Sequence, residues 1–134
     1  MICVAAAGKV VSLAATLVTL SWTHTIERVP WEEDWRLEEG RLVLAEARVK
    51  GSGAGMEPPA DARLIDGWWR FRPALPPRAR ITLAASDAVA AGWRLCAGEH
   101  CHTIGALPDG AGPITIEPCA ADADMTAGPT TTRP

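Results

Sequence analysis

The chain has 134 residues, 48% of them hydrophobic, and a formal net charge of −3. This length and hydrophobic content fit one folded domain with its own core and exclude a wholly disordered chain. The small negative charge argues against nucleic acid as a partner, because nucleic-acid-binding surfaces are usually basic. The chain has six tryptophans, one phenylalanine and no tyrosine. We therefore expect tryptophan to supply nearly all the aromatic groups of the core.

Residues 1–20 are mostly apolar, and the sequence from residue 2 predicts three strands, ICVAA, VVSLA and TLVTLSWTHTI, with the first turn at residues 7–9. Apolar residues alternate with polar ones in the third segment, which is typical of a strand and not of a signal helix. The alternative interpretation of residues 1–20 is a signal peptide or membrane anchor. Lys9 interrupts that run, and the apolar stretch after it falls short of the ~20 residues that span a bilayer.

The middle of the chain predicts more short strands. Pro30 is expected to interrupt strand pairing, and the alternating segments EEDWRLE and LVLAEARVK follow it, separated by a turn at Gly40. The segment ARLIDGWWRF predicts a hairpin with its turn at Asp66-Gly67, because this dipeptide suits the tight turns of hairpins. PALPPRAR is too rich in proline for a central strand, so we expect it to be extended and exposed. One side of LVLAEARVK is expected to carry Val43, Ala45, Ala47 and Val49.

The last strands are predicted from short apolar runs. RITLAAS and GWRLCAG are expected to pair, CHTIG to return beside them, and PITIEPC to add an edge strand. The sum is an all-β fold, a single-domain antiparallel β-sandwich or partly open barrel of about 8–10 short strands over residues 1–119. Residues 120–134, rich in Ala, Asp, Thr and Pro, predict a disordered tail.

The stretch WTHTIERVPWEEDW brings a histidine and several carboxylates close to three tryptophans. Alternation places His24 on the apolar side of its strand, and it places Glu33 on the side of Trp35 and Leu37. We therefore expect His24 and Glu33 to point inward and to form a pair, because a buried charge needs a partner. Such a pair serves to fix the strand register, to bind a ligand or handle a proton, or to hold a metal ion. One histidine with carboxylates lacks the ligand count and spacing of a usual metal site. The other acidic residues are expected to form a solvated face, and these are Glu32, Asp34, Glu38 and Glu39.

The segment KGSGAGMEPP, residues 50–59, is rich in glycine. It has neither the Gly-Lys-Ser/Thr ending of a phosphate-binding loop nor the spacing of a dinucleotide-binding fingerprint. Alternating glycines can curl backbone N–H groups into an anion-binding nest beside a lysine, so a small carboxylate or phosphate is the expected ligand. The plainer interpretation is a wide turn between strands. The candidate ligand-binding residues are His24, Glu27, Glu33, Lys50, Gly51, Gly53, Gly55 and Glu57.

Four cysteines allow three disulfide pairings, and the sequence does not choose among them. Cys96 and Cys101 flank a predicted hairpin tip, which suits a local disulfide, and Cys3 and Cys119 are candidates for a second. The competing interpretation is a zinc site in CAGEHCH, but its spacing matches no usual zinc motif. Free thiols are the third interpretation. We predict no metal site, no cofactor and no catalytic constellation.

WTHTIERVPWEEDW, ARVKGSGAGMEPP, DGWWRFRPALPP and WRLCAGEHC together resemble the small bacterial and archaeal family called domain of unknown function 1850, over residues 1–119. The family's usual histidine-serine-valine-glutamate run corresponds here to His24, Thr25, Ile26 and Glu27. Members are often encoded beside permease subunits of TAXI-type tripartite ATP-independent periplasmic (TRAP) transporters. The resemblance therefore implies an accessory role in solute uptake, with the permease or the solute-binding subunit as partner. It also implies a location in the periplasm or at the outer face of the inner membrane. A cytoplasmic location stays open, because no clean signal peptide precedes the domain.

Two functions follow from these observations. The first is a non-catalytic protein that binds a transporter component or its organic-acid solute, with Trp68 and Trp69 as a possible contact surface. The alternative is a small enzyme or metal-binding protein that uses His24 with Glu27 or Glu33. We expect the first, since the chain has no recognisable catalytic motif.

Overall fold

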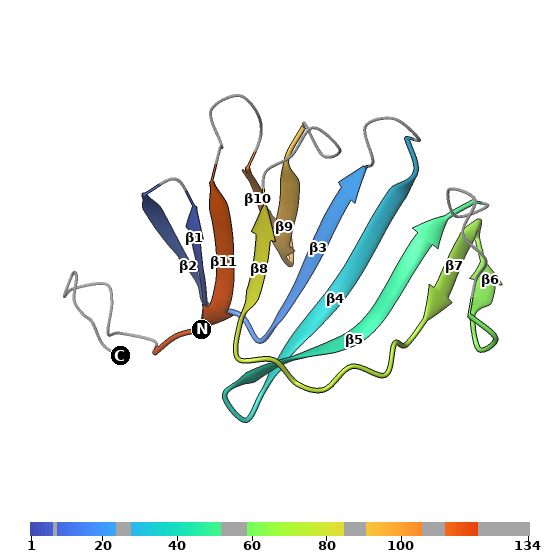
Figure 1. The fold of residues 1–134 in the computed structure, drawn as a ribbon, viewed down its shortest axis with the longest axis horizontal. Coiled ribbons are helices and arrows are strands. Elements are labelled where there is room, and N and C mark those ends of the chain that lie inside the picture. The colour runs from blue at the N-terminus through green and yellow to red at the C-terminus, as the bar shows by residue number, and fades with distance from the viewer. Residues whose placement is uncertain (7, 24–27, 52–58, 85–90, 106–111, 121–134) are drawn as a thin grey trace.

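The computed structural model of the chain describes residues 1–6, 8–23, 28–51, 59–84, 91–105 and 112–120. These residues form two antiparallel β-sheets that pack face to face as an open sandwich, as Figure 1 shows. Within the described part of the chain no helix is long and apolar enough to cross a membrane. The strands are β1 (Ile2–Ala6), β2 (Lys9–Leu13), β3 (Leu17–Thr23), β4 (Pro30–Glu38), β5 (Arg41–Lys50), β6 (Arg63–Ile65), β7 (Trp68–Phe71), β8 (Ile81–Ala84), β9 (Trp93–Ala97), β10 (His100–Ile104) and β11 (Pro113–Pro118).

The smaller sheet joins the two ends of the chain. Its strand order is β2-β1-β11-β8, so β11 lies between the first strand and β8. The expectation that PITIEPC forms an edge strand is therefore wrong. RITLAAS and GWRLCAG do not pair either, because β8 pairs with β11 while β9 pairs with β3 and β10 in the other sheet. The strands β8 and β9 follow each other in the chain but belong to different sheets, because each sheet contains strands from both halves of the chain.

The larger sheet has the order β10-β9-β3-β4-β5-β7-β6. Pro30 is the first residue of β4, opposite Thr23, so it begins the strand instead of interrupting the pairing. A proline is tolerated at this position because its missing N–H does not break a ladder in the strand interior. The Asp66-Gly67 turn between β6 and β7 is confirmed, and both residues have the positive φ that such a turn requires.

A β-bulge changes which residues of β5 face the core. Asp34 pairs with Glu46 and Trp35 with Leu44, so Ala45 has no partner in β4. The extra residue reverses the alternation, which a regular strand would have continued. The side of β5 that faces the core therefore carries Leu42 and Leu44 before the bulge and Ala47 and Val49 after it. The predicted side is right for Ala47 and Val49 and wrong for Val43 and Ala45.

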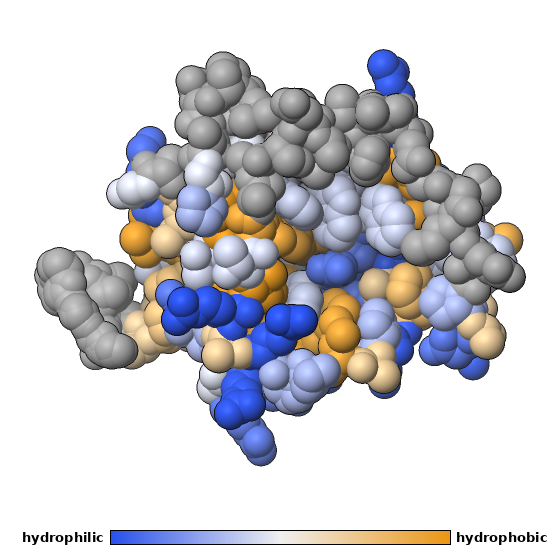
Figure 2. Space-filling view, viewed as in Figure 1, coloured by the Kyte–Doolittle hydropathy of each residue, from blue (hydrophilic) through white to orange (hydrophobic). Residues whose placement is uncertain are grey.

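The core lies between the two sheets and takes aliphatic residues from both. Of the six tryptophans, Trp35 is buried, with 4% of its surface exposed, and the other five are half-buried. The core is thus mostly aliphatic, and the aromatic groups in it and packed against it are tryptophans, as expected. In Figure 2 apolar residues gather over the small sheet, and many strongly hydrophilic residues lie along the lower edge. The most deeply buried side chains are Ile2, Val18, Leu20, Leu42, Val49, Leu95, Ile114 and Ile116.

The described strand ends next to residues 24–27, 52–58, 85–90 and 106–111 lie at one end of the sandwich, the upper end in Figure 1. The proline-rich segment that precedes β8 runs along the opposite end and is exposed, as predicted, apart from half-buried Pro73 and one bridge between Leu42 and Arg78. The predicted tail from residue 121 onward lies outside the described residues.

Candidate functional site

Strand register decides which of the predicted site residues come together. Glu33 lies directly opposite Leu20 on one side and Ala47 on the other, so its side chain is on the face that carries the core. Lys50 follows Ala47 by three residues, and side chains alternate along a strand, so Lys50 is on the outer face. The structure therefore places Glu33 and Lys50 on opposite faces of the large sheet and does not combine them in one site.

Glu33 faces inward, as its alternation with Trp35 predicts. Its Oε1 accepts a hydrogen bond of 3.0 Å from Trp35 Nε1. Burial raises the pKa of the Glu33 carboxyl, and the hydrogen bond from Trp35 opposes this only in part. Among the described residues, the Glu33 carboxyl therefore has Trp35 as its hydrogen-bond donor and no cation as its partner. The predicted pair with His24 lies outside the described residues, as does Glu27.

Lys50 ends β5 at the upper end of the large sheet. Its Nζ lies 5.4 Å from the ring centroid of Trp68, which is a cation–π distance. Gly51 follows with φ of 70° and donates its backbone N–H to the carbonyl of Gly67 over 2.8 Å. This N–H already has a partner in the β6–β7 turn, so it is not available to a nest. The other predicted members of the glycine segment, Gly53, Gly55 and Glu57, lie outside the described residues.

Tryptophans gather at the upper end of β3, β4 and β9. Trp22 and Trp31 are direct cross-strand partners, and their rings stack with centroids 6.1 Å apart and planes 5° apart. Trp93 packs against Trp22 at a centroid distance of 4.9 Å and an angle of 53°. Aromatic rings attract each other in both arrangements, so each fixes its neighbour. The result is a packed aromatic cluster at the end of the sheet.

An open cleft of about 380 Å³ borders this cluster, and we call it the tryptophan cleft. It takes hydroxyl and charged residues from the outer face of the sheet and three tryptophans from the inner face. The cleft could not be predicted from the sequence, because only the strand order brings β9 beside β3. The cleft is lined by Ser21, Trp22, Thr23, Pro30, Trp31, Glu32, Trp68, Ala91, Gly92, Trp93, Arg94 and Thr103.

The cleft contains one exposed cation. Arg94 lies opposite Ser21 on the outer face, and no described carboxylate is within ion-pair distance of it. Glu32 also lines the cleft, but its Oε1 accepts a hydrogen bond of 2.7 Å from Arg48. A guanidinium next to hydroxyl groups and aromatic rings is a set of groups that binds a carboxylate attached to an apolar body.

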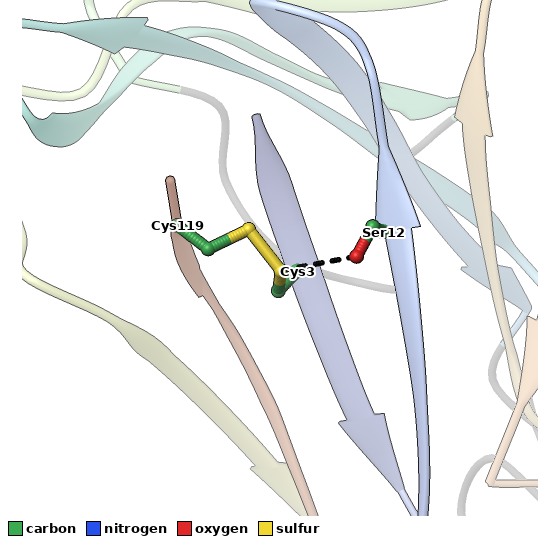
Figure 3. The surroundings of a disulfide bond; sticks show 3 residues. All are labelled: Cys3, Ser12 and Cys119. Atoms are coloured by element: carbon green, nitrogen blue, oxygen red, sulfur yellow. Dashed lines mark hydrogen bonds between the residues drawn. A yellow bond between two sulfur atoms is a disulfide. The ribbon is translucent and has the colours of Figure 1, made fainter. Parts of the chain in front are cut away.

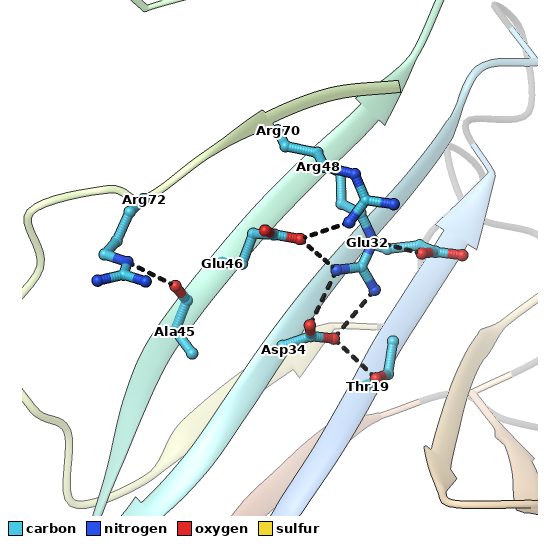
Figure 4. Close-up of polar contacts among 8 residues, drawn as sticks. All are labelled: Thr19, Glu32, Asp34, Ala45, Glu46, Arg48, Arg70 and Arg72. Carbon is cyan, nitrogen blue, oxygen red and sulfur yellow. Dashed lines mark hydrogen bonds and ion pairs between the residues drawn. The ribbon is translucent and has the colours of Figure 1, made fainter. Parts of the chain in front are cut away.

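Arg48 organises a network on the outer face below the cleft, shown in Figure 4. Its guanidinium contacts Glu32, Asp34 over 2.9 Å and Glu46 over 2.6 Å, and only 11% of its side chain is exposed. Glu46 also pairs with Arg70, over 2.9 Å. Glu32 and Asp34 are therefore members of a half-buried network, and the prediction that they form a solvated face is wrong. The short strand-to-strand spacing brings these long side chains within reach of one another.

The network shifts the pKa of Asp34 and of Arg48. Burial alone would raise the pKa of Asp34, but hydrogen bonds from Arg48 and Thr19 and the charges of Arg48 and Arg70 outweigh it and lower the pKa. Hydrogen bonding to Asp34 raises the pKa of Arg48 against the opposing effect of burial, and Glu32 and Glu46 raise it further. Both groups are thus held in their charged forms.

Two disulfides join the four cysteines. Cys3 is bridged to Cys119 beside β1, with Cα atoms 5.8 Å apart, and Figure 3 shows this bond next to Ser12. Cys96 is bridged to Cys101, its direct cross-strand partner in β9 and β10. Both candidate pairs of the sequence analysis are therefore confirmed, and they are compatible with an oxidising compartment outside the cytoplasm. Because the cysteines are oxidised, they are not zinc ligands, and the described residues contain no group of three or more metal-binding side chains.

Comparison with known protein families gives a match. The model of a family described as a domain of unknown function, DUF1850, matches residues 18–104. This range runs from β3 to β10 and contains the whole tryptophan cleft and the Arg48 network, whereas β1, β2 and β11 of the small sheet lie outside it. No curated protein and no solved structure matches the chain. Since the matched range covers more than half of its length, the chain belongs to the DUF1850 family.

Proposed function

We propose that the protein is a non-catalytic accessory of a TAXI-type TRAP transporter and that the tryptophan cleft binds an organic-acid solute of that transporter. The observation that carries the proposed binding site is Arg94, an exposed guanidinium among hydroxyl groups and tryptophans with no described carboxylate beside it. The transporter itself, with its permease or solute-binding subunit as partner, is proposed from the family resemblance alone.

The chemistry of the cleft favours a carboxylate over other small ligands. A guanidinium donates two parallel hydrogen bonds to a carboxylate, and the hydroxyls of Ser21 and Thr103 supply further donors from neighbouring strands. Trp22 and Trp31 offer flat apolar surfaces to the body of the ligand. The cleft is open and pre-formed by the stacked rings, which suits reversible binding of a small solute.

The proposed location is the periplasm or the outer face of the inner membrane. Two disulfides fit this location because bridges persist in oxidising compartments and are rare in the cytosol.

The binding site is tested by titrating the oxidised full chain with succinate, glutamate and benzoate, each beside its neutral amide, and following tryptophan fluorescence. We expect at least one acid to bind more tightly than its amide. Arg94→Gln should weaken binding of that acid about tenfold or more, since a hydrogen bond to a charged group contributes about 1.5–3 kcal/mol. Arg63→Gln is the matched control, because Arg63 is exposed on β6 and lies outside the cleft. Equal binding of acids and amides, or an Arg94→Gln variant that binds like the parent, would contradict the proposed site.

The transporter role needs a separate test. The full chain, captured after cross-linking from membranes of its own host, is expected to bring down the permease or the solute-binding subunit. Capture of neither would contradict the accessory role while leaving the binding site intact.

A second candidate function is a small enzyme that uses Glu33, because burial raises the pKa of its carboxyl and perturbed carboxyls often mark active sites. Glu33→Gln separates the two functions. Carboxylate binding in the cleft is expected to survive this substitution, because Glu33 is not one of the residues that line the cleft.

A further inference from the structure

A second open depression, of about 600 Å³, lies on the inner side of the β9–β10 hairpin and is distinct from the tryptophan cleft. Much of its lining is small and apolar, and its two ionisable side chains are both histidines. The residues that matter here are Ala14, Ala15, Ala97, Gly98, His100 and His102.

Strand register places the two histidines on the same face. His100 pairs with Ala97 and His102 pairs with Leu95, and Leu95 is a buried residue of the core. Residues two apart on a strand point the same way, so both imidazoles leave β10 on the inner side, with Cα atoms about 6.7 Å apart. Both histidines are exposed at the edge of the sheet and both line the depression.

This spacing suits chelation of one metal ion. An imidazole nitrogen binds zinc at about 2.0–2.1 Å, and each side chain needs only to turn toward the other to bring two nitrogens to the same ion. The small residues around them leave room for such an ion and for further ligands on it. Because both imidazoles are exposed, neither has to be uncovered before the ion can bind.

The disulfide next to this pair defines the donor set and holds it in place. Cys101 lies between His100 and His102 on the opposite face of β10, bridged to Cys96. The bridge removes two thiols that would otherwise compete as ligands, and it ties β10 to β9 at the position of the histidines. The imidazoles are therefore the only strong metal donors that the described residues bring to this depression.

We propose that His100 and His102 chelate one transition-metal ion of the kind that prefers imidazole, Cu²⁺ or Zn²⁺, at the edge of the large sheet. Cu²⁺ binds the more tightly of the two, because divalent ions follow the Irving–Williams order at nitrogen sites. The remaining coordination positions face the depression and are filled by water or by a small ligand of the ion. This site is independent of the tryptophan cleft and of the proposed transporter role.

The test uses the untagged full chain with both disulfides oxidised, freed of metal and titrated with Cu²⁺ by calorimetry and by electron paramagnetic resonance. We expect one ion per chain and a spectrum with two coordinated nitrogens. His100→Ala and His102→Ala should each weaken Cu²⁺ binding about tenfold or more.

A matched variant keeps the number of histidines and places one of them on the other face of β10. The double substitution His102→Thr with Thr103→His moves one imidazole to the outer face of β10 without changing composition. We expect it to bind Cu²⁺ as weakly as the single alanine variants, with an unchanged urea midpoint as the check on folding. If this variant binds like the parent, or if the parent spectrum shows a single nitrogen, Cu²⁺ binding is adventitious and the proposed chelate is wrong.

Discussion

Removing the Cys3–Cys119 bridge is expected to cost far more stability than removing the Cys96–Cys101 bridge. The first bridge joins residues 116 positions apart and the second joins residues only 5 apart. A cross-link stabilises mainly by limiting the unfolded chain, and this effect grows with the logarithm of the loop length. The loop-entropy relation gives about 4.8 kcal/mol for the long loop and about 2.1 kcal/mol for the short one at 25 °C.

The backbone contacts around the Cys3–Cys119 bridge do not depend on it, so its removal should act mainly on the unfolded chain. β1 and β11 pair from Ile2 to Ala6, and the backbone N–H of Cys119 donates to the carbonyl of Met1 over 3.0 Å. These contacts do not require the sulfur bridge, so replacing its cysteines with serine leaves the neighbouring strands their hydrogen bonds. Each pair of serine substitutions therefore reports chiefly on the length of the loop that is released.

The assay is urea unfolding of both double-serine variants and the parent, followed by tryptophan fluorescence and extrapolated linearly to water. We expect the Cys3→Ser/Cys119→Ser variant to lose about 2.7 kcal/mol more than the Cys96→Ser/Cys101→Ser variant, with a steeper urea dependence because its unfolded chain is more expanded. If the first variant is already unfolded without urea, an osmolyte such as trimethylamine N-oxide restores a measurable transition. Equal losses, or a larger loss from the short loop, would refute the reasoning.

Three further predictions concern single residues, and the first two have a control substitution. Arg48→Met leaves Glu32 and Asp34 without the cation that binds them and leaves Glu46 with Arg70 alone. We expect unfolding measurements to show a loss of about 2 kcal/mol, less than the ~3–5 kcal/mol of a fully buried pair. Arg36→Met, in an exposed pair, should cost under ~0.5 kcal/mol. Gly105→Ala should lower the free energy of unfolding by about 2–4 kcal/mol, because φ is 75° and a Cβ would lie 2.5 Å from the Cδ1 methyl of Ile114. Gly98→Ala, where φ is 62° and nothing lies within 4 Å, should cost about 1 kcal/mol. Equal losses in the two variants would contradict the predicted clash with Ile114. Glu33→Gln should raise the free energy of unfolding at pH 7. Burial raises the folded-state pKa of Glu33 above the ordinary 4.5, so the parent loses stability as the pH rises from 4.5 through the folded-state pKa, whereas glutamine does not ionise. The gain should vanish below pH 4.5, and a gain that persists there would contradict the raised pKa of Glu33.

Local alternation determines much of what the sequence reveals. It predicts most of the strands, the Asp66-Gly67 hairpin and the inward side chain of Glu33, because side-chain direction in a strand depends only on parity along the chain. It also predicts short strands in the first twenty residues, and β1 and β2 have this form. Parity fails at the bulge in β5, where one residue without a partner reverses the pattern.

The order of the strands and the composition of the sites depend on contacts between distant parts of the chain. Alternation says which side of a strand is apolar and does not say which strand lies beside it, so it could not place β11 between β1 and β8. Nor could it bring Trp93 against Trp22, which lies seventy-one positions earlier in the chain, or set Lys50 and Glu33 on opposite faces of one sheet. The sequence by itself determined that this protein is built from short alternating strands, and it left the state and the pairing of the four cysteines open. Only tertiary packing decided where its tryptophans and arginines meet, because pairing between distant strands is set by the burial of the whole core.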